Sequence, residues 1–264
     1  MIEPEEELGA ALRRRLSISL LAMGPLFLAY EFAASSAASG GKALRNTSEL
    51  FLSQPLELVS AGASWRWLIL ALVLGACLAR AIHKGQHFGE GVLWSILEGA
   101  GLGILMGPVM LMLLGGVMGW LPSGELAAAA APEPSVVGLV LGGAAWEELL
   151  FRFLLFAAIY QLGRWAFRFL DGETERSRWP AEVLALVLSS LAFAAAHLDV
   201  VVGWLGVGGE DYNFTLFAWR SFAGVLLAAI ARSRGLGVAA WAHAIFNLGL
   251  VLGSGPGVFL LTPG

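Results

Sequence analysis

The chain has 264 residues, of which 58% are hydrophobic and 14% are charged, and its formal net charge is −4. A soluble domain carries about 25% charged residues, so this composition excludes an ordinary soluble domain and indicates a lipid environment. The single cysteine, Cys77, excludes disulfides within the chain, cysteine-rich zinc sites and Cys-x-x-Cys redox chemistry.

Seven apolar stretches are long enough, or nearly so, to cross a bilayer as helices. They cover residues 16–38, 67–81, 91–121, 136–160, 181–202, 214–231 and 236–261. The second stretch is short, and the third and seventh are long enough to hide a break, so eight spans are also allowed. The sequence therefore predicts an all-α, polytopic transmembrane helical bundle of about seven spans.

The basic residues predict the orientation of the bundle. They cluster before the first stretch, after the second, between the fourth and fifth, and between the sixth and seventh, so all four clusters fall on one side. By the positive-inside rule this side is cytoplasmic, which places the N-terminus in the cytoplasm. The composition is rich in Arg, Ala and Gly, which is typical of a GC-rich bacterial genome and predicts a multi-pass protein of the bacterial inner membrane.

Several features outside the main motifs have simple explanations. Gly99, Gly103 and Gly107 are spaced by four in an apolar stretch, which favours close helix packing over a dinucleotide-binding loop. Asn46 begins the sequence NTS, which matches a glycosylation sequon. Arg220 is expected to extend towards the outer interface beside Trp219. Glu31 and Glu98 receive no role.

The fourth stretch contains three charged residues in the middle of an apolar run. Each costs about 2.5–3.5 kcal/mol at the centre of a spanning helix, so all three are functional candidates. Glu148 and Arg152 are four residues apart on one helical face, which predicts an ion pair. Glu147 is rotated by about 100°, so its carboxylate is left unpaired and available as a general base. A structural ion network of all three residues is the alternative.

Two further stretches carry polar side chains of catalytic type. His197 ends the sequence FAAAH, four residues after Phe193, and a hydrogen-bonded core histidine is the alternative explanation for it. His243 and Asn247 are also four residues apart, in HAIFN, and share a helical face. Both can donate hydrogen bonds, as a developing oxyanion requires. Three stretches in the C-terminal half thus present polar groups at a similar depth.

Together these motifs resemble the CPBP family of intramembrane proteases, which includes the type II CAAX prenyl endopeptidases and the bacterial Abi proteins. The family pattern is Glu-Glu-x-x-x-Arg, Phe-x-x-x-His and His-x-x-x-Asn on successive helices, present here as EELLFR from Glu147, FAAAH from Phe193 and HAIFN from His243. The resemblance covers about half of the chain. It implies that residues 136–264 form a catalytic helical core and that residues 1–135 form N-terminal transmembrane helices and loops.

The resemblance also implies the groups that would perform the chemistry. Glu147 and His197 would activate a water for attack on a peptide carbonyl, and Glu148 and Arg152 would support them. No metal or other cofactor is expected. The alternative is a catalytic zinc ion bound by Glu147, His197 and His243, with one open position.

The remaining motif residues would contact the substrate. By the same resemblance His243 and Asn247 would form the oxyanion hole, which stabilises charge on the carbonyl oxygen. Phe193 and Phe151 would line the substrate pocket.

The implied activity is endopeptidase cleavage near the C-terminus or membrane anchor of a membrane-associated protein or peptide. The expected partners are that anchored or lipidated substrate and the lipid bilayer, with no nucleic acid, and the oligomeric state is left open. A non-proteolytic bacteriocin-immunity or scaffold protein of the same fold is one alternative. A transporter is another, although it would spread ionisable residues along a path instead of gathering them in three motifs.

Overall fold

A computed structural model describes residues 4–39, 45–57, 64–83, 88–118, 134–171, 178–205 and 208–254, and these residues are almost entirely helical. In chain order the elements are α1 (Pro4–Ser39), α2 (Thr47–Glu57), α3 (Ser64–His83), α4 (Phe88–Met118), α5 (Pro134–Glu148), the π-helix η1 (Leu149–Leu155), α6 (Phe156–Asp171), α7 (Arg178–Ala195), α8 (Asp199–Val202), the 3₁₀-helix η2 (Gly203–Leu205), α9 (Phe214–Arg234) and α10 (Leu236–Ser254). No β-strand occurs within the described ranges. The predicted all-α fold is therefore confirmed there.

Four described helices are long and apolar enough to cross a bilayer, in segments Leu16–Ser36, Phe88–Leu113, Arg178–Ala195 and Phe214–Arg234. Trp67–His83 and Leu236–Leu252 are shorter apolar helices. Each of the seven predicted stretches overlaps a helix, but the predicted count of seven or eight spans is not confirmed. The fourth stretch differs from a plain span, because the π-helix η1, which contains Arg152, interrupts it.

The fifth predicted stretch, residues 181–202, is not one continuous helix. Helix α7 ends at Ala195, where the backbone N–H groups of His197 and Leu198 donate to carbonyls three residues back, at 3.3 and 3.0 Å. Such tightened bonds are common where a helix stops. His197 therefore lies in the turn after α7, and the apolar residues that follow belong to the short helix α8.

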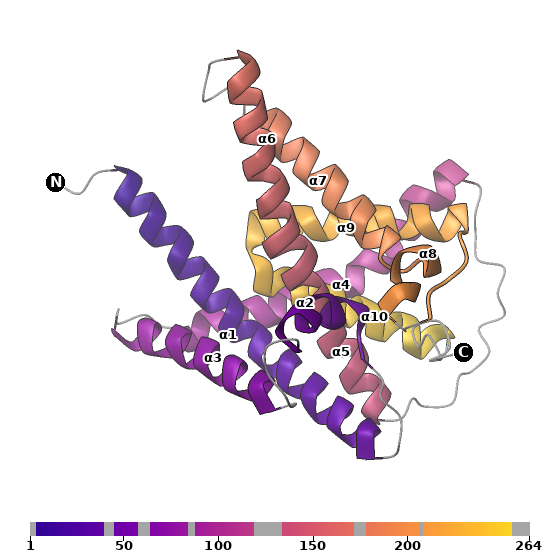
Figure 1. Cartoon of the computed structure of the whole chain (residues 1–264), viewed down its shortest axis with the longest axis horizontal. Coiled ribbons are helices and arrows are strands. Elements are labelled where there is room, and N and C mark those ends of the chain that lie inside the picture. The colour runs from indigo at the N-terminus through magenta and orange to yellow at the C-terminus, as the bar shows by residue number, and fades with distance from the viewer. Residues whose placement is uncertain are drawn as a thin grey trace.

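Glycines allow α5 to approach α1 very closely. A methyl group added at Gly142 would lie 2.2 Å from Cβ of Tyr30, and one at Gly138 would lie 2.6 Å from Cβ of Ala33. Helices in lipid associate mainly through such close van der Waals packing, since lipid tails are as apolar as the side chains. The packing holds α5 against α1 and near α2 (Figure 1).

Helix α10 contacts α1, α4, α5 and α9, and its contact with α4 also depends on glycine. A methyl group at Gly99 would lie 2.5 Å from Cβ of Trp241, and one at Gly103 would lie 2.5 Å from the carbonyl oxygen of Ala242. The predicted packing role of these two glycines is confirmed. At Gly107 the nearest atom would be 3.9 Å away, so this glycine is not needed for close approach.

Alanine substitutions on α4 should separate the packing role of glycine from its effect on the helix itself. Gly103→Ala is expected to destabilise the protein by about 1–3 kcal/mol, because the backbone of α10 blocks the new methyl group. Gly101→Ala on the same helix meets nothing within 4 Å and should be neutral or stabilising. Unfolding in detergent micelles measures both, and equal stability of the two variants would contradict the packing role.

The outward surface of the bundle is apolar, as expected of a protein in lipid. Large hydrophobic side chains are exposed on α3, α4, α6 and α7, among them Leu72, Met112, Phe169 and Val183. Helices α6 and α7 pack together, and the C-terminal end of α6 and the N-terminal end of α7 project away from the rest of the bundle (Figure 1). Exposed apolar area of this extent is unusual on a soluble monomer. With the four apolar segments it supports an integral membrane protein.

Candidate active site

The two adjacent glutamates end α5, and a π-helix follows them directly. Glu148 is completely buried, while Glu147 is 8% and Arg152 is 6% exposed. Arg152 lies inside η1, whose wider turn changes the direction in which successive side chains point. Short π-helical segments occur often at functional sites. The sequence analysis did not predict this segment.

The predicted ion pair within this segment is confirmed. Nε of Arg152 lies 3.4 Å from Oε2 of Glu148. The guanidinium also donates through Nη2 to the carbonyl oxygen of Gly224 on α9, at 3.4 Å, and lies 4.4 Å from the ring centre of Phe193. A carboxylate, a carbonyl and an aromatic face thus surround the buried cation, each of which favours its charge.

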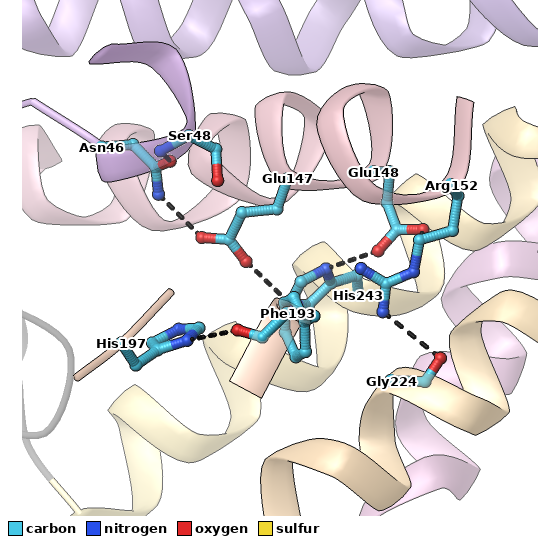
Figure 2. A network of polar contacts seen from close by, with 9 residues as sticks. All are labelled: Asn46, Ser48, Glu147, Glu148, Arg152, Phe193, His197, Gly224 and His243. Atoms are coloured by element: carbon cyan, nitrogen blue, oxygen red, sulfur yellow. Dashed lines mark hydrogen bonds and ion pairs between the residues drawn. The ribbon is translucent and has the colours of Figure 1, made fainter. Parts of the chain in front are cut away.

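His243 lies between the two carboxylates. Its Nδ1 is 2.9 Å from Oε1 of Glu148, and its Nε2 is 3.4 Å from Oε2 of Glu147 (Figure 2). The spacing in HAIFN associates His243 with Asn247, one turn further along α10. Asn247 is partly buried, and its side chain makes no hydrogen bond to another described residue. The shared oxyanion role of the two side chains stays a prediction.

His197 lies near this network, but the hydrogen bond of its side chain is to the backbone. Nδ1 of His197 is 2.9 Å from the carbonyl oxygen of Phe193. A carbonyl only accepts, so Nδ1 carries the hydrogen and Nε2 of the neutral ring keeps a lone pair. The ring of Phe193 packs edge to face against His197 and His243, with ring centres 5.3 and 5.5 Å apart. Phe193 therefore sets the spacing of the two histidines.

The two phenylalanines predicted to line the substrate pocket are both buried. Phe151 and Phe193 are each 4% exposed, and their ring centres lie 5.5 Å apart. They form one small apolar cluster with Ala196. Contact of this cluster with a substrate stays a prediction.

The site includes one residue that the sequence analysis did not assign to it. Nδ2 of Asn46 donates to Oε1 of Glu147 at 2.7 Å (Figure 2). Its side-chain oxygen accepts from the backbone N–H of Ser48 at 2.8 Å, which makes Asn46 the N-cap of α2. The available signal was the sequence NTSE, because an N-cap residue followed three positions later by Glu is a helix start. The same letters NTS also match a glycosylation sequon, and the sequence was interpreted in that way instead of as a helix start.

Arg220 also makes a contact that the sequence analysis did not predict. Its Nη2 donates to Oε1 of Glu210 at 2.6 Å, and its Nη1 contacts the other carboxylate oxygen. The backbone N–H of Glu210 donates to the carbonyl of His197 at 2.8 Å, and the carbonyl of Glu210 accepts from Asp199 at 3.0 Å. Arg220 therefore holds, through Glu210, the segment that carries His197. Of the two glutamates that receive no role from the sequence, Glu98 pairs with Arg234, and Glu31 is buried on α1.

The ion pair between Arg220 and Glu210 predicts that the stability of the protein depends on pH. Burial alone would raise the pKa of the Glu210 carboxyl, but the hydrogen bond and charge of Arg220 outweigh it and hold this pKa below its ordinary value of 4.5. A carboxyl whose pKa is depressed by folding stabilises the protein above its unfolded pKa and loses that contribution as pH falls through the folded pKa. Glu210→Gln should therefore cost on the order of 1–3 kcal/mol near neutral pH. The cost should shrink as pH falls below 4.5.

Unfolding of Glu210→Gln in micelles over this pH range measures the effect. Glu182→Gln is the matched control, because it breaks a more exposed pair, between Arg232 and Glu182, that lies away from the histidines. A stability difference for Glu210→Gln that stays constant with pH would contradict the assignment.

The alternative zinc site would use Glu147, His197 and His243 as its ligands. Within the described ranges no group of three or more His, Cys, Asp or Glu side chains could hold a metal ion. Nδ1 of His197 faces a backbone carbonyl, and both ring nitrogens of His243 face carboxylates. No three-ligand site is therefore formed by Glu147, His197 and His243 in the part of the chain that the structure describes. A mechanism without metal stays a prediction.

The fold and these side chains define a class of protein, an integral membrane helical protein with a buried carboxylate, histidine and arginine cluster. Residues 130–249 match the family model described as Rce1-like, type II CAAX prenyl endopeptidase, and this range contains all three motifs. This match supports assignment of residues 130–249 to the CPBP/CAAX protease family. Comparison with curated proteins and with solved structures gave no match.

Proposed function

We propose that the protein is an intramembrane endopeptidase that hydrolyses a peptide bond near the C-terminus or membrane anchor of a membrane-associated protein or peptide. One observation carries the proposal. Glu147 is a buried carboxylate with one oxygen held by Asn46 and the other turned towards His243, inside the region that matches the CAAX endopeptidase family. A carboxylate fixed at one oxygen and available at the other suits a general base.

The proposed reaction begins with a water beside Glu147. Glu147 accepts a proton from this water through Oε2 while the water oxygen attacks the scissile carbonyl, and the lone pair on Nε2 of His197 orients the water. The carbonyl becomes a tetrahedral oxyanion. Glu147 then returns the proton to the amide nitrogen, the C–N bond breaks, and the immediate products are a carboxylic acid and an amine, which become a carboxylate and an ammonium group when the acid proton passes to the amine.

The other buried groups stabilise this centre. The amide of Asn247 donates to the oxyanion, and His243 donates through Nε2 when its ring carries a proton on both nitrogens. Glu148 accepts from Nδ1 of His243, which fixes the ring, and Arg152 balances the charge of Glu148. In this proposal residues 136–264 form the catalytic core.

The proposed setting is the bacterial inner membrane, with the N-terminus in the cytoplasm. The distribution of basic residues supports this orientation. An anchored or lipidated substrate would then reach the site from within the bilayer.

The proposal is tested by mass spectrometry of protein C-termini in membranes of cells that express the wild type, Glu147→Ala or His197→Ala. New C-termini should appear with the wild type and be missing with both variants. Identical C-termini in all three samples would contradict proteolysis. They would favour an immunity or scaffold function of the same fold.

A further inference from the structure

Asn46 contacts Glu147 from outside the region that matches the protease family. It lies in the N-terminal part of the chain, 101 residues before its partner, whereas the family match begins at residue 130. The hydrogen bond from its Nδ2 to Oε1 of Glu147 is 2.7 Å long (Figure 2). The matched region therefore does not contain every contact of its own carboxylate.

The side-chain amide of Asn46 is fixed in one orientation. Its oxygen accepts from the backbone N–H of Ser48, so the NH₂ group is the part that faces Glu147. Its backbone N–H donates to the hydroxyl of Tyr30 at 2.7 Å, and this hydroxyl donates to Glu49 at 2.8 Å. Tyr30 and Glu49 are each 1% exposed. A buried network on α1 and α2 thus holds Asn46 from both sides.

A glycine on α5 leaves space for this amide. Gly143 lies one helical turn before Glu147, and a methyl group added there would lie 2.9 Å from Nδ2 of Asn46. The three nearest atoms to that methyl group all belong to Asn46. Any larger side chain at position 143 would therefore push the amide away from Glu147.

We propose that Asn46 is a positioning residue for Glu147, a role that rests on the proposed function. Its donated hydrogen bond holds Oε1 and stabilises the ionised carboxylate. This leaves Oε2, on the side of His243, to accept a proton from water. The N-terminal part of the chain thus completes the site.

Two substitutions at position 46 separate this role from helix capping. Ser and Asp cap a helix about as well as Asn, so Asn46→Ser and Asn46→Asp should both retain the N-cap of α2. Ser is too short to reach Glu147, and kcat should fall about tenfold with KM unchanged. Asp places a second carboxylate beside Glu147, and kcat should fall by on the order of a hundredfold. The acidic limb of the pH–rate profile should move to higher pH in both variants.

The rates are measured on purified full-length protein in lipid vesicles, with a membrane segment whose cleavage the C-terminal comparison identifies. Asn213→Ser and Asn213→Asp are matched controls, because Asn213 caps α9 through Leu216 away from Glu147. Gly143→Ala provides an independent variant that leaves Asn46 intact and should resemble Asn46→Ser. If Asn46→Asp does not fold, Asn46→Ser and Gly143→Ala still decide the question.

A spectroscopic measurement does not depend on cleavage. The infrared band of the protonated Glu147 carboxyl, identified by its loss in Glu147→Gln, should appear at higher pH in Asn46→Ser than in the wild type. Equal kcat and an unmoved band for Asn, Ser and Asp at position 46 would overturn the inference. Full activity of Glu147→Gln would instead overturn the proposed function, so the two failures are distinguishable.

Discussion

Replacement of Glu147 by glutamine is expected to lower kcat by about a thousandfold, because a general base typically contributes 10²–10⁴. Glutamine has nearly the same shape, and its side-chain oxygen can still accept the hydrogen bond from Asn46. The fold should therefore persist while the proton acceptor is lost. Cleavage in lipid vesicles and thermal unfolding in micelles, measured on the same preparation, separate the two effects.

The matched control for this variant is Glu98→Gln. It makes the same chemical change in a glutamate that pairs with Arg234, where the side chains are 30% and 59% exposed. Exposed pairs of this kind contribute about 0–1 kcal/mol, so cleavage should stay at the wild-type level. A Glu147→Gln protein that cleaves within about tenfold of the wild type would contradict the role of this carboxylate as the base.

Replacement of Arg152 by methionine should have the largest effect on stability. The side chains of Arg152 and Glu148 are 2% and 0% exposed, so the variant leaves a buried carboxylate without its cation. Removal of one partner of a buried pair costs about 3–5 kcal/mol. The free energy of unfolding in micelles should fall by about this amount, whereas Arg234→Met should change it by about 0–1 kcal/mol.

A double variant distinguishes the charge effect from a loss of packing. Replacement of a buried pair by apolar residues of similar volume is often neutral, so Glu148→Leu combined with Arg152→Met should regain most of the lost stability. Cleavage should stay low, because His243 loses the carboxylate beside its Nδ1. If the stability lost in the double variant instead equals the sum of the losses in Glu148→Leu alone and Arg152→Met alone, the two residues do not form a coupled pair.

The sequence predicted those parts of the site that depend on spacing within one helix. Glu148 and Arg152 are four residues apart in one continuous helical segment, so their pairing depends only on local geometry. The close packing at Gly99 and Gly103 was predicted for the same reason. The family motifs also identified the three segments that meet at the site.

Contacts between distant segments were not predictable in this way. The position of His243 between two carboxylates depends on how α10 packs on α5, and the contact of Asn46 joins residues 101 positions apart. The same limit applies to Arg220, whose partner Glu210 lies in a loop. Spacing along the chain carries no information on which side chains a folded loop brings together.

The sequence also did not predict where helix α7 ends. Apolar residues continue past Ala195 into α8, so the hydropathy pattern gave no stop signal for α7. The turn at His197 is instead fixed by backbone bonds to Glu210. The widened helix η1 has no sequence signature, although it carries Arg152.

The most direct measurement of the central claim uses only purified components. The full chain is placed in lipid vesicles with one membrane segment whose C-terminus is trimmed in cells, and products are followed by mass spectrometry. The wild type should release the same new C-terminus that forms in cells, and Glu147→Gln should release it about a thousandfold more slowly. No product from the wild type, or equal product from Glu147→Gln, would contradict an endopeptidase that uses Glu147 to activate water.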